Sequence, residues 1–352
     1  LLEAIRNFYG DPKYYRDIER AAFLYSGIMV SGVIDEKPDS EEYAQSFWDY
    51  FLFDYHLLGN VNENSLLEIW NGKKYQDIRE RMLKCDFSKC KHPFLKCGFD
   101  NPININELKD FDSKVNYPRY LHLCYDMECD YNCITCRDEI YTNTEADIKM
   151  YDKMLPDLLK LINKAEFIHF SGGDAFASVY TRNLLKEINQ KYNNFLLSVH
   201  TNGYHCDKKN FEELGIKKLD LVGLSINATN RETYKKIMRK DAFDRIINNL
   251  GFLKEMKEQG NIGTILIKMV VHSLNYEEMP AFVKLGKKYN AQVLFIPYEP
   301  WDTAEMYKRY KEVAVFDPSN KDFPKFKKML KDPIFKDYAC ILPYNFIDIL
   351  NS

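Results

Sequence analysis

The sequence predicts an α/β fold: a partial (β/α)6 TIM-like barrel with a smaller N-terminal domain. From residue 118 onward, short β-rich runs alternate with longer stretches in which apolar residues recur at helical spacing. Strand–helix repetition of this kind implies parallel strands joined by right-handed crossovers. Six units, where a closed barrel has eight, leave the barrel open. The active site is then expected at the carboxyl ends of the strands.

The expected elements alternate along the chain. The strands lie at 119–125, 167–171, 195–201, 219–226, 264–272 and 292–297. The helical patterns between them lie at 147–164, 181–192, 207–214, 229–258 and 276–289. Beyond residue 300 the chain becomes polar and aromatic, with helical patterns at 303–311 and 323–331. We therefore expect a barrel domain over 116–300 and a C-terminal extension over 301–352 that packs on it.

Residues 1–115 lack this alternation and predict a separate N-terminal domain. An aromatic-rich stretch, Phe47–His56, precedes a helical pattern over Ser65–Leu83. Three cysteines follow this helix in a loop-like region that contains Pro93 and Gly98. This region therefore differs in character from the barrel.

Composition limits the classes of function. Hydrophobic residues make up 45% of the 352 residues and charged residues 29%, as in an ordinary globular protein. The formal net charge of −3 argues against non-specific nucleic-acid binding, because phosphate contacts need a basic surface. No apolar run approaches the length of a membrane span. We expect a cytoplasmic protein that binds neither nucleic acid nor membrane.

The nine cysteines are unevenly distributed. A disulfide framework would spread pairs across a small secreted fold. Cysteines clustered at short spacing in a large chain instead indicate metal binding. Seven of the nine fall in one segment of the chain, at Cys85, Cys90, Cys97, Cys124, Cys129, Cys133 and Cys136.

The strongest motif is C-x3-C-x2-C, formed by Cys129, Cys133 and Cys136 directly after the first barrel strand. Iron–sulfur clusters are held by cysteine thiolates, typically four. Three close ligands would leave one iron of a cubane without a protein ligand and free to bind a substrate or cofactor. A structural zinc site is the alternative, but it requires four ligands. Cys124 could be the fourth, although inside a strand a small buried thiol is the simpler interpretation.

This loop, placed after the first strand of a six-unit barrel, resembles the radical S-adenosylmethionine (SAM) superfamily, and the resemblance covers about 118–300. It implies a [4Fe–4S] cluster on Cys129, Cys133 and Cys136. The cluster would reductively cleave SAM to a 5′-deoxyadenosyl radical, which abstracts hydrogen from a substrate. Thr135 departs from the family, which usually has an aromatic residue just before the third cysteine.

The resemblance also assigns SAM-binding residues to the ends of the second and third strands. Gly172, Gly173 and Asp174 stand where the family usually has Gly-Gly-Glu, and would meet the SAM ammonium through backbone carbonyls and the carboxylate. The glycines allow close backbone approach. Asp in place of Glu makes the acidic contact one methylene shorter. Thr201 and Asn202 match the family's Thr-Asn-Gly pattern.

The later strands complete the implied SAM site. Ser225 and Asn227 follow the fourth strand, where family members contact the SAM carboxylate or ribose. Arg239 corresponds to a basic residue near the SAM carboxylate. Pro297 and Tyr298 end the sixth strand, near the expected position of the adenine.

The N-terminal region resembles the SPASM extension of many radical SAM enzymes at Leu58–Val61, Ser65–Asn71 and Arg79–Arg81. That extension usually follows the barrel; here it precedes it, so the order is permuted. SPASM domains often hold auxiliary [4Fe–4S] clusters. Cys90 and Cys97 match the downstream cysteines of the pattern, but the upstream cysteines expected near 25–35 are absent.

A second candidate metal site therefore remains open at Cys85, Cys90 and Cys97. An auxiliary iron–sulfur cluster is one alternative. Zinc is another, with His92 as a fourth ligand in a Cys3His set. The third alternative is a substrate-docking region without metal, since three ligands are one short of a closed site.

Four further residues admit both a functional and a structural interpretation. Cys206 or Cys340 could donate hydrogen to a substrate radical, as cysteines do in some family members, but a lone cysteine is more often a small buried hydrophobe. His169 and His200 lie near strand ends, where a hydrogen-bonded histidine is favoured over a catalytic base. The 25 Tyr and 23 Phe are explained by packing, although a peptide-binding groove would use them too.

The resemblance implies a peptide-modifying enzyme, because SPASM-type members often act on peptide or protein side chains. A sugar or another small metabolite is the alternative substrate class. A non-catalytic zinc or iron–sulfur interaction protein is the alternative from a different functional class. The expected partners are the substrate and a reducing protein such as flavodoxin or ferredoxin.

Overall fold

The structure is a computed structural model that describes residues 27–31, 59–61, 63–83, 116–192, 194–299 and 309–351. The aromatic stretch Phe47–His56, the cysteines Cys85, Cys90 and Cys97, and most of the helical pattern at 303–311 lie outside these residues.

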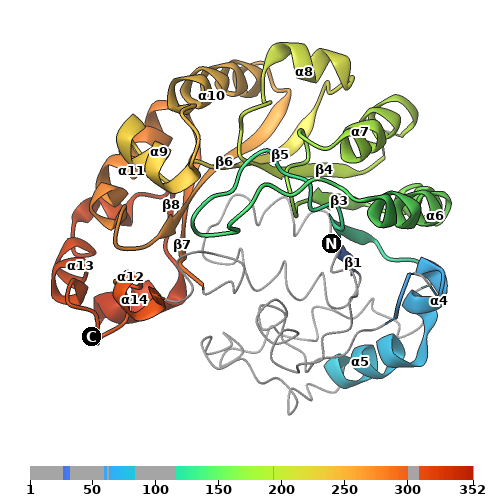
Figure 1. The fold of residues 1–352 in the computed structure, drawn as a ribbon, viewed down its shortest axis with the longest axis horizontal. Coiled ribbons are helices and arrows are strands. Elements are labelled where there is room, and N and C mark those ends of the chain that lie inside the picture. The colour runs from blue at the N-terminus through green and yellow to red at the C-terminus, as the bar shows by residue number, and fades with distance from the viewer. Residues whose placement is uncertain are drawn as a thin grey trace.

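The described residues form one sheet of eight parallel strands, arranged in chain order from β1 to β8. Figure 1 shows the sheet curving inside an outer arc of helices, so the architecture is an open partial barrel. The bounds are β1 Gly27–Ser31, β2 Tyr120–Cys124, β3 Phe167–Phe170, β4 Leu196–Thr201, β5 Leu219–Ser225, β6 Ile262–Val271, β7 Gln292–Pro297 and β8 Cys340–Ile341.

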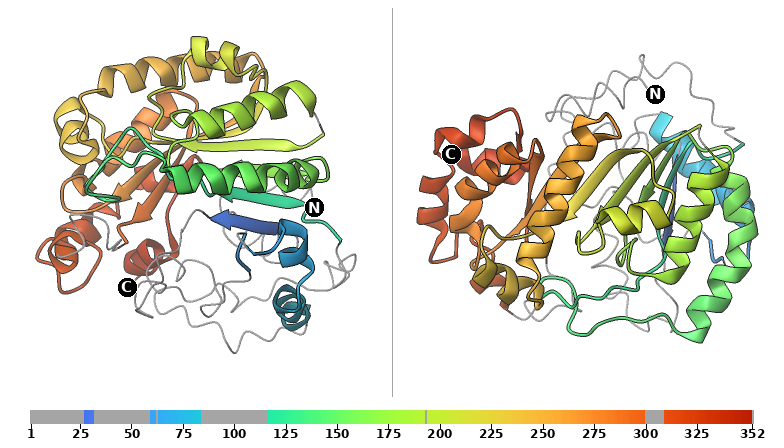
Figure 2. Two further views of the ribbon diagram at one scale, coloured as in Figure 1. Left: turned by 45° about the vertical axis from the view of Figure 1, so that its right-hand side comes forward. Right: turned by 90° about the horizontal axis from the view of Figure 1, so that it is seen from above.

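The six predicted strands are confirmed as β2 to β7, and the sheet continues by one strand at each edge. β1 pairs with β2 in parallel, although its residues belong to the region predicted as a separate domain. β8 contributes two residues beside β7. Figure 2 shows β1 at one edge of the sheet and the C-terminal helices at the other.

The helices that follow the strands lie close to their predicted positions. Two predicted helices are each divided in two. The pattern over Ser65–Leu83 breaks at Gly72, and the pattern over 229–258 breaks after Met238, where Arg239 adopts the left-handed conformation with φ 55°. The bounds are α4 Leu66–Asn71, α5 Lys73–Leu83, α6 Glu145–Ile162, α7 Val179–Lys191, α8 Lys208–Glu213, α9 Arg231–Met238, α10 Phe243–Glu258, η4 Tyr276–Glu278, α11 Met279–Lys288, α12 Tyr310–Val313, α13 Phe323–Met329, η6 Pro333–Lys336 and α14 Tyr344–Asn351.

Side-chain caps start the helices nearest the barrel's first strands. Ser65 and Glu68 form a capping box at α4, and Thr144 and Asp147 form another at α6. Such caps satisfy backbone N–H groups that have no partner within the helix. They fix where α6 leaves the loop that carries the predicted cluster cysteines.

The two faces of the sheet differ in character. Alternate residues of β2 to β7, such as Leu121, Ile168 and Val199, enter the large apolar core beneath the helices. The intervening positions face the inside of the barrel. There Leu266, Leu294 and Ile341 of β6 to β8 form a small apolar cluster, β6 also carries Lys268, and β2 to β4 carry histidine and serine. Within the described residues, no helix is both long and apolar enough to cross a membrane.

Candidate active site

Cys129, the first cysteine of the predicted cluster loop, lies five residues after the end of β2, at the carboxyl end of the sheet. Cys129 N–H donates to the carbonyl of Tyr141 over 3.2 Å, and Cys136 N–H donates to the carbonyl of Cys133 over 3.0 Å. Ile134 N–H donates to the carbonyl of Ile237 over 3.0 Å, which ties the loop to α9. The loop is thereby held between the start of α6 and the end of α9.

The three thiols influence one another electrostatically. Burial raises the pKa of Cys129 to about 12 and that of Cys133 well above its ordinary value, and the sulfurs of Cys136 and Cys129 add to the shift at Cys133. Burial alone would lower the pKa of Arg137, but its hydrogen bond and charge interaction with Cys136 hold it above its ordinary value. The guanidinium therefore lies among thiols that must lose their protons to bind iron.

The donor set fits a cubane cluster by its chemistry, because iron–sulfur clusters are held by cysteine thiolates and this loop offers three. Cys129, Cys133 and Cys136 would hold three of its irons.

Gly172 and Gly173 bring the end of β3 against the backbone that leads into the cysteine loop. Gly172 has a φ of 105°, which favours glycine. A Cβ on Gly173 would lie 2.1 Å from the carbonyl oxygen of Glu128. The N–H groups of Gly173 and Asp174 donate to the carbonyls of Asp126 and Glu128 over 2.9 and 2.8 Å. Glycine at 173 is thus required by close packing of the two loops.

The Asp174 carboxylate joins the ends of β3 and β4. One oxygen accepts from Thr201 Oγ1 over 2.8 Å and from the Asn202 N–H over 2.7 Å, and the other accepts from the Phe176 N–H over 3.0 Å. Burial raises the pKa of Asp174 above its ordinary value, although these donors oppose the shift. The predicted SAM residues at 174, 201 and 202 therefore form one hydrogen-bonded unit. That they contact SAM remains a prediction.

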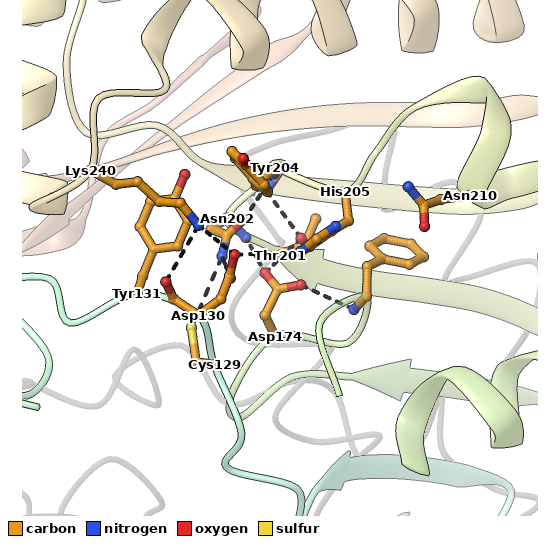
Figure 3. Close-up of polar contacts among 12 residues, drawn as sticks. Cys129, Asp130, Tyr131, Asp174, Thr201, Asn202, Tyr204, His205, Asn210 and Lys240 are labelled. Carbon is orange, nitrogen blue, oxygen red and sulfur yellow. Dashed lines mark hydrogen bonds and ion pairs between the residues drawn. The ribbon is translucent and has the colours of Figure 1, made fainter. Parts of the chain in front are cut away.

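A charged network connects this unit to the cysteine loop (Figure 3). Asn202 Nδ2 donates to Asp130 Oδ1 over 3.1 Å and lies 4.0 Å from the sulfur of Cys129. Lys240 Nζ donates to Asp130 Oδ2 over 2.6 Å, and His205 Nε2 lies 3.4 Å from the same oxygen. Burial raises the pKa of Asp130, but His205 and Lys240 together bring it well below its ordinary value. We call Asp130, Asp174, Asn202, His205 and Lys240 the rim network.

Sequence reasoning missed Lys240. Its ammonium lies 4.5 Å from the ring centroid of Tyr131 and 3.9 Å from that of Tyr204, where cation–π attraction adds to the ion pair with Asp130. The predicted basic residue, Arg239, is exposed and donates to the carbonyl of Asp138 over 3.3 Å. The left-handed turn at Arg239 sends these neighbouring side chains in different directions. The only signal in the sequence was a second basic residue next to the expected one.

The predicted residues on β5 to β7 lie farther along the same edge of the sheet. Ser225 is the last residue of β5 and is partly buried. Asn227 is buried with a φ of 61°; its Oδ1 accepts from the Val270 N–H over 2.8 Å, and its Nδ2 lies 3.3 Å from the sulfur of Met238. Met238 in turn lies 3.7 Å from the sulfur of Cys133. The methionine, which sequence reasoning missed, links Asn227 to the cysteine loop.

Pro297 ends β7, and Tyr298 follows it as a buried residue. The Tyr298 hydroxyl finds no hydrogen-bond partner among the described residues. Burial raises the pKa of Tyr298, so the phenol stays protonated at neutral pH. That Pro297 and Tyr298 lie beside the adenine stays a prediction.

The remaining candidates differ from one another. Cys206 is buried, as predicted, and Cys340 is partly buried. Burial raises the pKa of both thiols, which disfavours a reactive thiolate at either position. His169 is hydrogen-bonded to Ser198 as predicted, but for His200 the prediction was wrong, because its Nε2 is buried without a partner among the described residues.

Comparisons with known proteins agree with this geometry. The model of the radical SAM superfamily matches residues 128–286, and the model of the SPASM iron-sulfur cluster-binding domain matches residues 45–97. The second match precedes the first in the chain, in the permuted order that the sequence predicted.

Among curated proteins, the GTP 3′,8-cyclase of Chlorobaculum tepidum is 23% identical over 192 residues, which cover 54% of this chain and 56% of that enzyme. The probable GTP 3′,8-cyclase of Saccharolobus islandicus is 33% identical over 93 residues, or 26% of this chain and 28% of that protein. The chain thus spans little more than half the length of the first relative.

Among solved structures, Streptococcus suis SuiB bound to precursor peptide SuiA aligns with a TM-score of 0.44 and 17% identity. The alignment covers 78% of this chain and 53% of that one.

Proposed function

We propose that this chain, which belongs to the radical SAM superfamily, binds a [4Fe–4S] cluster and SAM and abstracts a hydrogen atom from its substrate. The family match and the C-x3-C-x2-C loop support the choice of cofactors. When bound, the cluster and SAM supply the radical chemistry, and the protein supplies binding and orientation. Cys129, Cys133 and Cys136 would hold three irons of the cluster.

The observation that carries the proposal is the contact between the cysteine loop and two neighbouring strand ends. The hydrogen bonds of Asp174 and Asn202 join the ends of β3 and β4, and Asn202 continues to Asp130 within the loop. A ligand chelating the open iron would lie against these polar groups. The rim network would hold its donors in fixed positions before the ligand binds, which is the main contribution that a protein makes to such chemistry.

The proposed substrate is a peptide or protein side chain. The SPASM match at residues 45–97 supports this choice, because such extensions accompany the barrel in many peptide-modifying members. A reducing protein, flavodoxin or ferredoxin, is the proposed electron donor. The proposed domains are 1–115, 116–300 and 301–352, with β1 contributed to the barrel sheet by the first.

A small metabolite is the second candidate substrate. The curated relatives named GTP 3′,8-cyclase favour it, since by that name they act on a nucleotide. The match covers 54% of this chain and 56% of that enzyme at 23% identity, which is weak support for a shared substrate.

The test is anaerobic reconstitution with iron and sulfide, followed by SAM and dithionite, with 5′-deoxyadenosine as the measured product. Wild-type protein should form it, and Cys133→Ala should not. Incubation with candidate peptides and with nucleotides then distinguishes the substrates, because the true substrate should accelerate product formation. Preferential zinc binding without a cluster would contradict the proposal.

A further inference from the structure

Three histidines lie side by side on the inner face of the barrel. His122 on β2 is the register partner of His169 on β3, and their ring centroids are 4.7 Å apart. His200 on β4 continues the series, 4.3 Å from His169 with the rings at 87°. We call these three residues the imidazole row.

The row lies directly below the predicted SAM motifs. Ser171, whose Oγ lies within hydrogen-bonding distance of His122 Nε2, immediately precedes Gly172. His200 immediately precedes Thr201. A group bound at the row would therefore hold the rest of its molecule close to the position expected for the reactive carbon of SAM. This is where the substrate of the proposed reaction must lie.

The row is incompletely hydrogen-bonded. His122 Nε2 lies 2.6 Å from Ser171 Oγ, and His169 Nδ1 lies 2.9 Å from Ser198 Oγ. His200 Nε2 is buried and has no partner among the described residues. Buried polar atoms in native proteins are normally paired, so one that is not points to a missing water or ligand.

The neighbouring strand makes room for the His200 ring. A Cβ on Gly223 of β5 would lie 2.3 Å from His200 Cδ2 and 2.7 Å from His200 Nε2. Any other residue at 223 would push the ring out of the row. The glycine therefore keeps His200 in line with His169.

One positively charged side chain, Lys268 on β6, acts electrostatically on all three histidines. Burial and, to a smaller extent, the charge of Lys268 lower the pKa of His122 to about 4. Burial also lowers the pKa of His169 and His200 well below the ordinary value, and Lys268 again contributes at both. The imidazoles are thus neutral at pH 7 and can donate one N–H each, while Lys268 supplies a nearby positive charge.

A metal is not the ligand that this arrangement suits. The rings follow one another edge to face instead of pointing at one centre. Across the ranges that the structure describes, no three potential ligands converge on an ion. Neutral N–H donors, serine hydroxyls and an ammonium instead match the oxygens of an anion.

We propose that the imidazole row and Lys268 bind an anionic group of the substrate, a carboxylate or a phosphate. The identity of the bound molecule as substrate rests on the proposed function. The binding itself does not, because it can be measured without SAM cleavage.

The experiment is isothermal titration calorimetry on the anaerobically reconstituted full chain, with and without SAM and without a reductant. Pyrophosphate and glutarate are the two probes. Wild-type protein should bind at least one of them. Lys268→Met and His200→Gln should each weaken that binding tenfold or more. His272→Gln is the matched control, because His272 also carries a buried, unpartnered Nε2 but lies outside the row; it should bind like wild type.

The probe that binds with the higher affinity shows from which of two sources the anion comes. Preference for pyrophosphate indicates a nucleotide or phosphorylated metabolite, and preference for glutarate indicates a carboxylate of a peptide. As a second measurement, 15N-histidine NMR of wild-type protein should show the largest shift at His200, which avoids reliance on variants that fail to fold.

Two results would overturn the proposal: no binding of either probe to wild-type protein, or unchanged binding in both Lys268→Met and His200→Gln. Anion binding without 5′-deoxyadenosine formation would support the site and contradict the proposed function. SAM cleavage without anion binding would support the proposed function and contradict the anion site.

Discussion

The rim network and the imidazole row are adjacent but differ in how completely their polar atoms are hydrogen-bonded. In the rim network, Asp130 accepts from Lys240 and Asn202, and Asp174 accepts from Thr201 and Asn202. In the row, His200 Nε2 has no partner among the described residues. Hydrogen-bonded polar networks fix one geometry, whereas an unpaired buried atom leaves a hydrogen bond for a water or a ligand to complete. The difference suggests a rigid cofactor site above a site completed by its substrate.

The largest effect is expected from Cys133→Ala. Removal of one of three thiolates should abolish the cluster, so bound iron and 5′-deoxyadenosine formation should both fall to background. Iron analysis and product chromatography measure the two quantities. Cys340→Ala is the control, since Cys340 lies on β8 at the far edge of the sheet; normal activity in Cys133→Ala would remove the basis for the cluster assignment.

A smaller but still large effect is expected from Gly173→Ala. The added Cβ would meet the backbone oxygen of Glu128 at 2.1 Å, so the two loops must separate. Overpacking of this kind costs about 3 kcal/mol of unfolding free energy. Urea unfolding measures it. Gly251→Ala in α10, where a new Cβ meets nothing within 4 Å, should instead be neutral or slightly stabilising; equal losses in both variants would show that the loop contact is unimportant.

The Asp130–Lys240 pair should show an intermediate effect in a double-mutant cycle. Its side chains are 28% and 30% exposed, so the pair is poorly screened by solvent. We expect a coupling free energy of about 1–2 kcal/mol from Asp130→Asn and Lys240→Met. Asp130→Asn should also slow SAM cleavage, because the Asn202 contact near Cys129 weakens.

The matched control is the Arg231–Asp241 pair, whose side chains are 57% and 38% exposed. Exposed pairs of this kind couple by less than about 1 kcal/mol. A coupling at the Asp130 pair no larger than this would mean that the rim network does not organise the cysteine loop.

The last prediction concerns the dependence of stability on pH. The pKa of His122 is lowered to about 4, below its unfolded value, so between about pH 6.5 and 4 the unfolded chain binds more protons than the folded one. Stability should therefore be full above pH 6.5 and decline as the pH falls. Each such histidine contributes at most about 1.4 kcal/mol per pH unit.

Urea unfolding between pH 5 and 7.5 measures this slope. His169→Gln should reduce it, because one neutral buried imidazole is removed. A slope that does not change in the variant, or stability that rises as the pH falls, would show that the row is protonated in the folded protein.

Some features were accessible to sequence reasoning because they repeat or are local. The alternation of apolar runs predicted β2 to β7, and the spacing of Cys129, Cys133 and Cys136 predicted the cysteine loop. β8 was missed because two residues carry no periodicity. β1 was missed because no helical pattern follows it to mark a strand–helix unit.

The rim network and the imidazole row depend on contacts between distant residues. Asp130 and Lys240 are 110 positions apart, and of the two neighbouring basic residues it is Lys240 that pairs with Asp130, while Arg239 donates to the carbonyl of Asp138. His169 and His200 were considered as single histidines near strand ends, and His122 was missed. Only the parallel register of β2, β3 and β4 places the three side by side.

The most direct test of the central claim is electron paramagnetic resonance of the reduced, reconstituted protein without and with SAM. A cubane on three cysteines leaves one iron open to SAM. Wild-type protein should therefore show a reduced [4Fe–4S] signal whose g values shift when SAM is added. A signal that SAM leaves unchanged, or no cubane signal at all, would contradict the claim that Cys129, Cys133 and Cys136 hold a SAM-binding cluster.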